Sequence, residues 1–181
     1  FSKVVVVLNS PNAMELGFLD NEAVDAAIWV GTPGATGCNS IGKVLTGEVN
    51  PSGKTVDTFP YAQESAPSYY NFGEFAYDNV TTTNTAILAG TGDAVAGTTP
   101  FYFVDYQEGI YVGYRYYETR YEDSVLGQGN AGGFTYADEV CYPFGFGLSY
   151  TTFDWTNFST SWSGKTCTAT VTVTNTGDVA G

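Results

Sequence analysis

The sequence has no histidine and little positive charge, and both shortages exclude whole classes of function. Its 181 residues include six lysines and arginines against nineteen aspartates and glutamates, a formal net charge of −13. Because so acidic a chain repels a phosphate backbone and its cations form no patch, nucleic-acid binding is excluded. Without histidine there is no Ser-His-Asp or Cys-His catalysis and no imidazole metal ligand. Any chemistry here has to use carboxylates.

Long apolar runs and cysteine motifs are missing as well. No stretch approaches the roughly 20 apolar residues of a membrane helix, and no signal-peptide pattern is present. The three cysteines, Cys38, Cys141 and Cys167, include no CxxC pair, which favours packed free thiols over a zinc site or a disulfide framework. The chain begins at Phe1 rather than at a methionine, and we expect it to be a fragment of a longer protein.

The first sixty residues alternate between strand and helix patterns. Val4–Leu8 is a β-branched run typical of a strand buried on both faces of a parallel sheet, and 27–31 contains a second short apolar run. Apolar side chains spaced along one helix face predict a helix from Cys38 to about Gly47. Lys54–Phe59 is typical of a further strand, ended by Pro60. This alternation predicts an α/β fold with a mostly parallel sheet.

The rest of the chain changes character twice. Residues 61–100 are rich in Ser, Thr, Asn and Gly and predict a long loop insertion. Aromatic strands are expected at 101–106 and 110–117. Residues 166–174 alternate strictly between threonine and small or apolar side chains, which indicates an antiparallel sheet with one wet face. We therefore expect an α/β domain over 1–142 and, over 143–181, the incomplete start of an immunoglobulin-like β-sandwich.

Carboxylates are the natural candidates for catalysis, because sugar-bond hydrolysis needs one acid and one nucleophile or base. Asp105 and Glu108 stand close together between the predicted aromatic strands, and Arg115 follows on the next strand. Solvated surface carboxylates, or a structural pairing of Glu108 with Arg115, explain the pattern as well. The same alternatives apply to Glu118, Glu122, Asp123, Asp138 and Glu139.

Glycines and tyrosines give weaker signals. Gly31, Gly34 and Gly37 have the spacing GxxGxxG, not the GxGxxG of dinucleotide sites, and tight packing at a helix start explains them better. The tyrosines between 111 and 117 could stack on sugar rings, but cross-strand core pairs are the commoner role of such residues. Asn79-Val80-Thr81 and Asn157-Phe158-Ser159 match the glycosylation pattern, which a chain rich in these residues also produces by chance.

Several dispersed motifs, in this order, resemble glycoside hydrolase family 3. The segments similar to its carboxyl-terminal α/β sandwich are Val4–Leu8, Asn9–Leu16, Ala27–Gly34, Val44–Lys54 and Phe59–Pro60. Glu108–Glu118 and Tyr142–Phe153 resemble the part that closes the sandwich and enters a fibronectin type III-like domain. The similarity covers nearly the whole chain and is weakest from about 61 to 100.

The resemblance implies a supporting role in a retaining β-glycosidase of the β-glucosidase type, which removes terminal non-reducing β-D-glycosyl residues. The family's nucleophile is an Asp on an amino-terminal barrel, and its acid/base usually lies upstream of the strand at Val4. We therefore expect no catalytic residue, cofactor or metal in this segment. Its expected partners are the barrel and a β-linked glycoside, with no nucleic acid and no membrane segment. A non-catalytic carbohydrate-binding or cell-surface module is the alternative.

Overall fold

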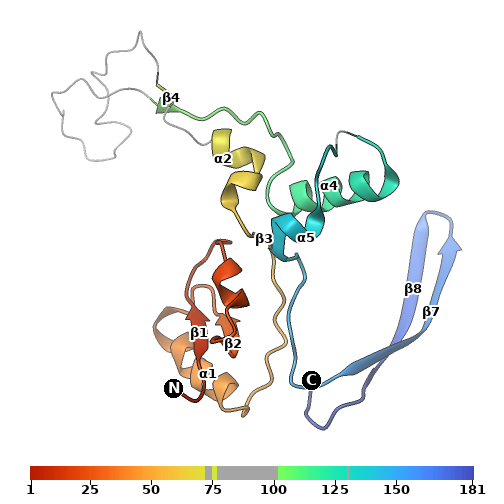
Figure 1. Cartoon of the computed structure of the whole chain (residues 1–181). Coiled ribbons are helices and arrows are strands. Elements are labelled where there is room, and N and C mark those ends of the chain that lie inside the picture. Colours follow the sequence, from red (N-terminus) through yellow and green to blue (C-terminus); the bar gives the residue numbers. More distant parts are fainter. Residues whose placement is uncertain (72–74, 77–101, 130) are drawn as a thin grey trace, which may run out of the picture. The chain divides into compact units, whose positions relative to one another are not determined.

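The computed structural model describes residues 1–71, 75–76, 102–129 and 131–181, and the chain divides into two compact units. One unit consists of Phe1–Phe59 and Cys141–Gly181, and the other of Pro60–Val140. The first carries the elements from β1 to α1 and the hairpin β7–β8, and the second carries α2, α4 and α5 (Figure 1). The fold is a mixture of helices and strands, as the sequence predicts.

The first unit begins with the expected parallel strands. β1 (Val5–Leu8) pairs with β2 (Ala26–Trp29) in register from Val5 opposite Ala26 to Leu8 opposite Trp29. The 3₁₀ helix η1 (Gly17–Asp20) lies between them in the chain. At the entrance to the pair, one carboxylate oxygen of Asp25 accepts a hydrogen bond from the Val4 amide at 2.7 Å and the other accepts one from Lys3 Nζ at 3.0 Å.

Only one face of this strand pair is packed within the described residues. Leu8, Leu16 and Phe59 are buried and form the core, against which Val6 and Trp29 pack. On the opposite face Val5 and Val7 remain 44% and 43% exposed. The prediction of a strand covered on both faces is therefore wrong for the part of the chain that the structure describes, although the parallel pairing is confirmed.

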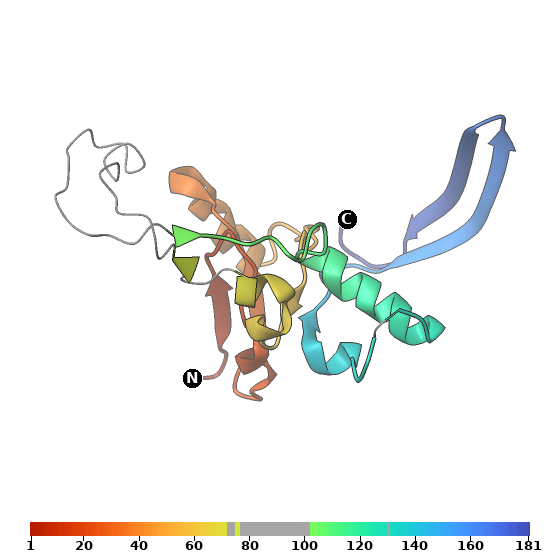
Figure 2. The same ribbon diagram turned by 90° about the horizontal axis from the view of Figure 1, so that it is seen from above.

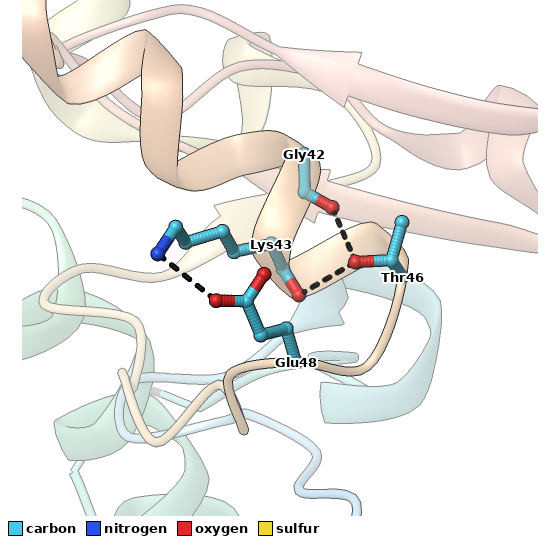
Figure 3. Close-up of polar contacts among 4 residues, drawn as sticks. All are labelled: Gly42, Lys43, Thr46 and Glu48. Atoms are coloured by element: carbon cyan, nitrogen blue, oxygen red, sulfur yellow. Dashed lines mark hydrogen bonds and ion pairs between the residues drawn. The ribbon is translucent and has the colours of Figure 1, made fainter.

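Helix α1 (Gly34–Leu45) confirms the expected helix and begins four residues earlier than predicted. Polar contacts between residues 42 and 48 stabilise its carboxyl end (Figure 3). Thr46 Oγ1 donates to the carbonyl of Gly42 at 3.0 Å and to that of Lys43 at 3.3 Å. Lys43 Nζ pairs with Glu48 at 3.0 Å. The Thr46 hydroxyl thus adds a donor to two carbonyls at the helix end, where intrahelical partners run out, and the ion pair links the last turn of the helix to the segment that leads to Asn50.

Residues 54–59 do not form the predicted strand. Only Phe59–Pro60 is a strand (β3), which pairs with β6 (Val140–Tyr142). Upstream, Thr55 exchanges backbone hydrogen bonds with Gly145 and Phe146 at 2.8 Å each. The Thr58 amide is bound by the Asp57 carboxylate, also at 2.8 Å. Because the Thr58 amide donates to the Asp57 side chain, it is not available for pairing with another strand. The strand pairing is therefore interrupted between Thr55 and Phe59.

The second unit is more helical than the sequence predicts. Part of the expected loop is ordered as η2 (Gln63–Ser65), α2 (Pro67–Asn71) and β4 (Phe75–Ala76), and most of its remainder lies outside the described residues. The aromatic strand expected at 101–106 is reduced to β5 (Tyr102–Phe103), antiparallel to β4. Two helices follow, α4 (Tyr114–Leu126) and α5 (Tyr136–Glu139).

The strand predicted over 110–117 is wrong, because the chain turns at Ile110–Val112 and enters α4 at Tyr114. Gly113 precedes the helix with φ of 57° and ψ of −134°. This backbone conformation is open to glycine and strongly disfavoured for other residues. The alternation of aromatic residues in this segment therefore comes from a turn and the first turn of a helix.

The chain ends in a long antiparallel hairpin, β7 (Phe153–Ser163) and β8 (Thr166–Asn175), which confirms the expected antiparallel strand (Figures 1 and 2). Its register places Trp155 opposite Val173 and Trp162 opposite Cys167. The opposite face carries the threonines of β8 and, from β7, serines together with Thr156 and Asp154. All residues of both strands are exposed, so in the described residues neither the apolar nor the hydroxyl-rich face is covered.

Candidate functional site

The carboxyl ends of β1 and β2 form the edge at which a parallel sheet usually binds ligands. The Val30 amide donates to the Leu8 carbonyl at 2.9 Å, so the strands stay together up to their ends. The Trp29 indole N–H donates to the Ser10 carbonyl at 2.7 Å, and its ring meets Phe59 edge-on at 5.2 Å. Trp29 therefore holds the segment after Leu8 at this edge, because its indole binds the Ser10 carbonyl while its ring packs against Phe59 of the core.

The glycines that follow this edge have conformational roles rather than a cofactor role. Gly31 and Gly34 adopt φ of 59° and 65°, and no heavy atom lies within 4 Å of a Cβ added at either position. Backbone conformation therefore requires glycine at both. A Cβ at Gly37 would lie 3.0 Å from that of Pro33, so a larger residue there would fit only if Pro33 shifted slightly. The interpretation of the series as tight packing at a helix start therefore holds for Gly37 and is wrong for Gly31 and Gly34, where the backbone conformation explains the glycine.

The candidate carboxylates bind neutral side chains. Asp105 accepts a hydrogen bond from Gln107 Nε2 at 2.7 Å, Glu108 one from Asn71 Nδ2 at 2.6 Å and Glu118 one from the Tyr136 hydroxyl at 2.6 Å. Of the other candidates, Glu122 and Asp138 are exposed, and Asp123 and Glu139 are half-buried. Each hydrogen-bonded carboxylate thus has its own structural partner, as the surface interpretation of these residues requires.

The Glu118–Tyr136 contact ties α5 to α4. Tyr136 also packs against Tyr121, with ring centroids 4.7 Å apart. Burial of the ring, together with the hydrogen bond to Glu118 and its negative charge, raises the pKa of Tyr136. The phenol therefore stays protonated at neutral pH and donates to the carboxylate, which gives Glu118 a structural role.

Arg115 and Glu108 are not an ion pair in the described part of the chain. Glu108 binds Asn71, whereas the exposed Arg115 guanidinium lies 5.7 Å from the centre of the Tyr114 ring. Glu108 was expected in the loop between the two aromatic strands and Arg115 on the second of them, but Arg115 lies on the surface of α4. An exposed cation–π contact of this kind contributes little to stability, so Arg115 is not the residue that anchors this segment.

The anchor of α4 is Tyr117, one of the tyrosines considered for sugar stacking. It is buried, its hydroxyl lies 2.7 Å from Ser65 Oγ, and its ring meets that of Tyr116 edge-on at 5.1 Å. Tyr111 by contrast is exposed in the turn before the helix. Both earlier interpretations of this cluster are wrong for Tyr117, because it is a core residue that joins a helix to η2 rather than a cross-strand pair.

Cysteines and acidic groups form no metal site in the described residues. Cys38 and Cys167 are exposed, so the expectation of packed thiols is wrong for both, whereas Cys141 is half-buried and packs against the core. No group of three or more cysteines, aspartates and glutamates is close enough to hold a metal ion among the residues that the structure describes. Within the same residues, no helix combines the length and apolar character needed to span a membrane.

Hydrogen bonds around Asn50 form a cluster that was not predicted from the sequence. We call it the linker clamp, and it joins residues 44–55 to residues 143–150 and to Ala180. The Asn50 carboxamide donates to Ser149 Oγ and to the Ala180 carbonyl at 3.0 Å each. Its oxygen accepts from the Tyr150 amide at 2.8 Å and from Ser149 Oγ at 3.1 Å. One half-buried side chain thereby holds the segment that leads into β7 and the end of the chain.

Further contacts of the linker clamp lie on both sides of Asn50. Thr55 Oγ1 donates to the Pro143 carbonyl at 2.6 Å, and Lys54 Nζ donates to the Gly147 carbonyl. The Tyr150 hydroxyl donates to the Val44 carbonyl at the end of α1, at 2.9 Å. The sequence Asn50-Pro51-Ser52-Gly53 is typical of a turn, and such a pattern does not show that its side chains bind a distant segment.

Comparison with known proteins identifies the family to which this chain belongs. The sequence profile of the glycosyl hydrolase family 3 C-terminal domain matches residues 1–114. The chain therefore belongs to glycosyl hydrolase family 3, as its motifs indicate. The beta-glucosidase of Ruminococcus albus is 34% identical over 154 residues, which are 85% of this chain and 12% of that protein. Beta-glucosidase B of Emericella nidulans is 36% identical over 180 residues, 98% of this chain and 17% of that protein.

Solved structures give the same result. Beta-glucosidase 3B from Thermotoga neapolitana, in complex with glucose, matches with a TM-score of 0.66 and 32% identity over 99% of this chain and 20% of that one. A beta-glucosidase from Paenibacillus barengoltzii matches with a TM-score of 0.65 and 29% identity, over 98% of this chain and 16% of its own. The chain thus spans about a fifth or less of the length of these relatives.

Proposed function

We propose that this chain is a scaffold segment of a retaining β-glycosidase of the β-glucosidase type. The parent protein, meaning the longer protein that contains this chain, would hydrolyse terminal non-reducing β-D-glycosyl residues. The observation that carries the proposal is the family match over residues 1–114, joined to relatives that are beta-glucosidases several times longer. The glucose-bound relative from Thermotoga neapolitana supports a glycoside as the substrate class.

Both catalytic carboxylates are proposed to lie outside this chain. Retention needs two carboxyl groups about 5 Å apart. Asp105, Glu108 and Glu118 each bind a different neutral side chain, which supports structural roles for all three. The segment would contribute by holding catalytic loops in place, because catalysis by paired carboxylates tolerates little misplacement.

We propose a division into an α/β domain over 1–142 and the start of a fibronectin type III-like domain over 143–181. The change from the parallel pair β1–β2 to the antiparallel hairpin β7–β8 supports this division. In this arrangement the linker clamp fixes where the second domain leaves the first. A missing barrel domain would be the partner of the α/β domain.

A non-catalytic carbohydrate-binding module is the second candidate, and one observation favours it. Trp155 and Trp162 are 71% and 73% exposed. By register both belong to the apolar face of the hairpin. Exposed tryptophans on one strand surface can stack on sugar rings. Trp155→Ala combined with Trp162→Ala in the parent protein would then abolish binding to insoluble β-glucan and leave hydrolysis of a small glucoside intact.

Hydrolysis of an aryl β-glucoside by the parent protein tests the leading proposal. Proton NMR of the first product should show the β-anomer of glucose, since retention forms it before mutarotation. An initial α-anomer would contradict retention, and the absence of hydrolysis by the folded parent protein would contradict the glycosidase proposal. Release of nitrophenol by the 181-residue chain alone would instead support a local carboxylate pair such as Asp105 and Glu108.

A further inference from the structure

One residue of the hairpin has a backbone conformation unlike that of its neighbours. The register of β7 and β8 is shifted between Thr156 and Ser159, so that Asn157 and Phe158 together stand opposite Val171. Asn157 has φ of 55° and is the sole non-glycine residue with positive φ among the described residues. A left-handed first residue is the hallmark of one type of β-bulge, and asparagine tolerates that conformation better than most residues.

The Asn157 carboxamide lies toward the hydroxyl-rich face of the hairpin. Its Nδ2 is 3.4 Å from Thr172 Oγ1, which is its one hydrogen bond in the described structure. Ser159 stands opposite Thr170, on the same face as Thr172. By register this face consists of the alternate threonines of β8 and, on β7, of Asp154, Thr156 and three serines, Ser159, Ser161 and Ser163. A large polar group attached there would stay in water and leave the apolar face with Trp155 and Trp162 unobstructed.

Asn157-Phe158-Ser159 also fits the acceptor pattern Asn-x-Ser/Thr, in which x is not proline. Asn50-Pro51-Ser52 fails that test because of its proline, and Asn50 is committed to the linker clamp. The second match, at Asn79, lies outside the described residues. Among described asparagines, Asn157 alone combines the pattern with an exposed carboxamide.

We propose that Asn157 is an N-glycosylation site. The donor would be an oligosaccharide linked through pyrophosphate to a lipid, the substrate class of the oligosaccharyltransferases of secretory pathways. Asn157 Nδ2 forms a bond to C1 of the first N-acetylglucosamine, and the bond between C1 and the pyrophosphate oxygen breaks. The lipid pyrophosphate leaves with the electron pair, and the amide loses one proton to a base of the transferase. This inference does not depend on the proposed glycosidase activity.

Peptide mass spectrometry of the parent protein secreted from yeast tests the proposal. After treatment with an endoglycosidase that leaves one sugar, the peptide containing Asn157 should carry a single N-acetylglucosamine. Asn157→Gln should abolish that modification. Ser159→Ala should abolish it as well while keeping Asn157 and its backbone conformation, so a folding defect in the first variant does not decide the result.

Matched controls separate the site from general effects on secretion. Ser159→Thr should retain the glycan, and Asn39→Gln, at an exposed asparagine of α1 outside any acceptor pattern, should leave it unchanged. A secreted protein whose Asn157 peptide is unmodified would overturn the proposal. Modification that persists in Ser159→Ala would also overturn it, because the acceptor pattern would then not be what the transferase reads.

Discussion

At the scale of single residues, Asn50 is the side chain on which the linker clamp depends. Its carboxamide makes hydrogen bonds to Ser149, Tyr150 and Ala180. Asn50→Ala leaves these groups without that partner, and we expect a loss of about 1–3 kcal/mol of stability. Thermal unfolding of the full-length protein measures it, with Asn39→Ala as the exposed control. An equal effect of the two substitutions would contradict the role given to Asn50.

Tyr117 gives a second prediction at this scale. Tyr117→Phe keeps the buried ring and removes the hydroxyl that meets Ser65 Oγ at 2.7 Å. We expect a loss of about 1 kcal/mol, the usual net value of one hydrogen bond. Tyr106→Phe, at an exposed tyrosine, should have almost no effect. In a double-mutant cycle with Ser65→Ala, purely additive losses would show that the two hydroxyls are not coupled.

Asp25 makes the start of the parallel pair sensitive to acid. The hydrogen bond from the Val4 amide, followed by that from Lys3, lowers the pKa of this carboxyl. A carboxyl whose pKa is lowered by folding stabilises the fold above its unfolded pKa, about 3.9, and loses this effect as pH falls through its folded pKa. Asp25→Asn should therefore destabilise the protein at pH 7, and the difference from wild type should shrink toward pH 3. A constant difference across this range, or an equal one in Glu22→Gln, would contradict this account.

At the scale of elements, helix α1 contains two glycines for which we expect opposite outcomes. Gly34 begins the helix with φ of 65°, so Gly34→Ala should cost about 1–2 kcal/mol through left-handed strain. Gly42 lies inside the helix with open space around it, so Gly42→Ala should stabilise by about 0.5–1 kcal/mol. Melting temperatures of the two variants check this, and a shift of the same sign in both would contradict the assignment of the helix start.

Elements whose residue pattern is compatible with only one type of secondary structure were predictable from the sequence. The spacing in α1 fits the helical period, the alternation in β8 fits the strand period, and the run before Leu8 is short and β-branched, as strands are; each of the three elements formed. The segment 110–117 fitted two patterns, that of a strand and that of a helix. Its alternation suggested a strand, but Tyr114, Tyr117 and Tyr121 also follow helical spacing, and Tyr117 is the one that is buried. Burial against η2 decided the outcome, and no local pattern could reveal it.

The linker clamp escaped prediction for a similar reason. Asn50 and Ser149 are 99 residues apart in the chain and meet at 3.0 Å. A turn motif signals how the backbone bends, but it carries no information about which distant segment its side chains will bind. Motif order did identify the family, because several short segments in one sequence restrict the possible folds far more than any single contact.

At the scale of the whole molecule, the central claim is that this chain supports a glycosidase whose reacting carboxylates lie elsewhere. The most direct measurement is kcat of the full-length protein for an aryl β-glucoside after Asp105→Asn, Glu108→Gln and Glu118→Gln, made singly. The account predicts turnover within a few-fold of wild type for each variant, since these carboxylates bind neutral side chains. A loss of about 10²–10⁴-fold in kcat at an unchanged melting temperature, in any one of the three, would contradict it.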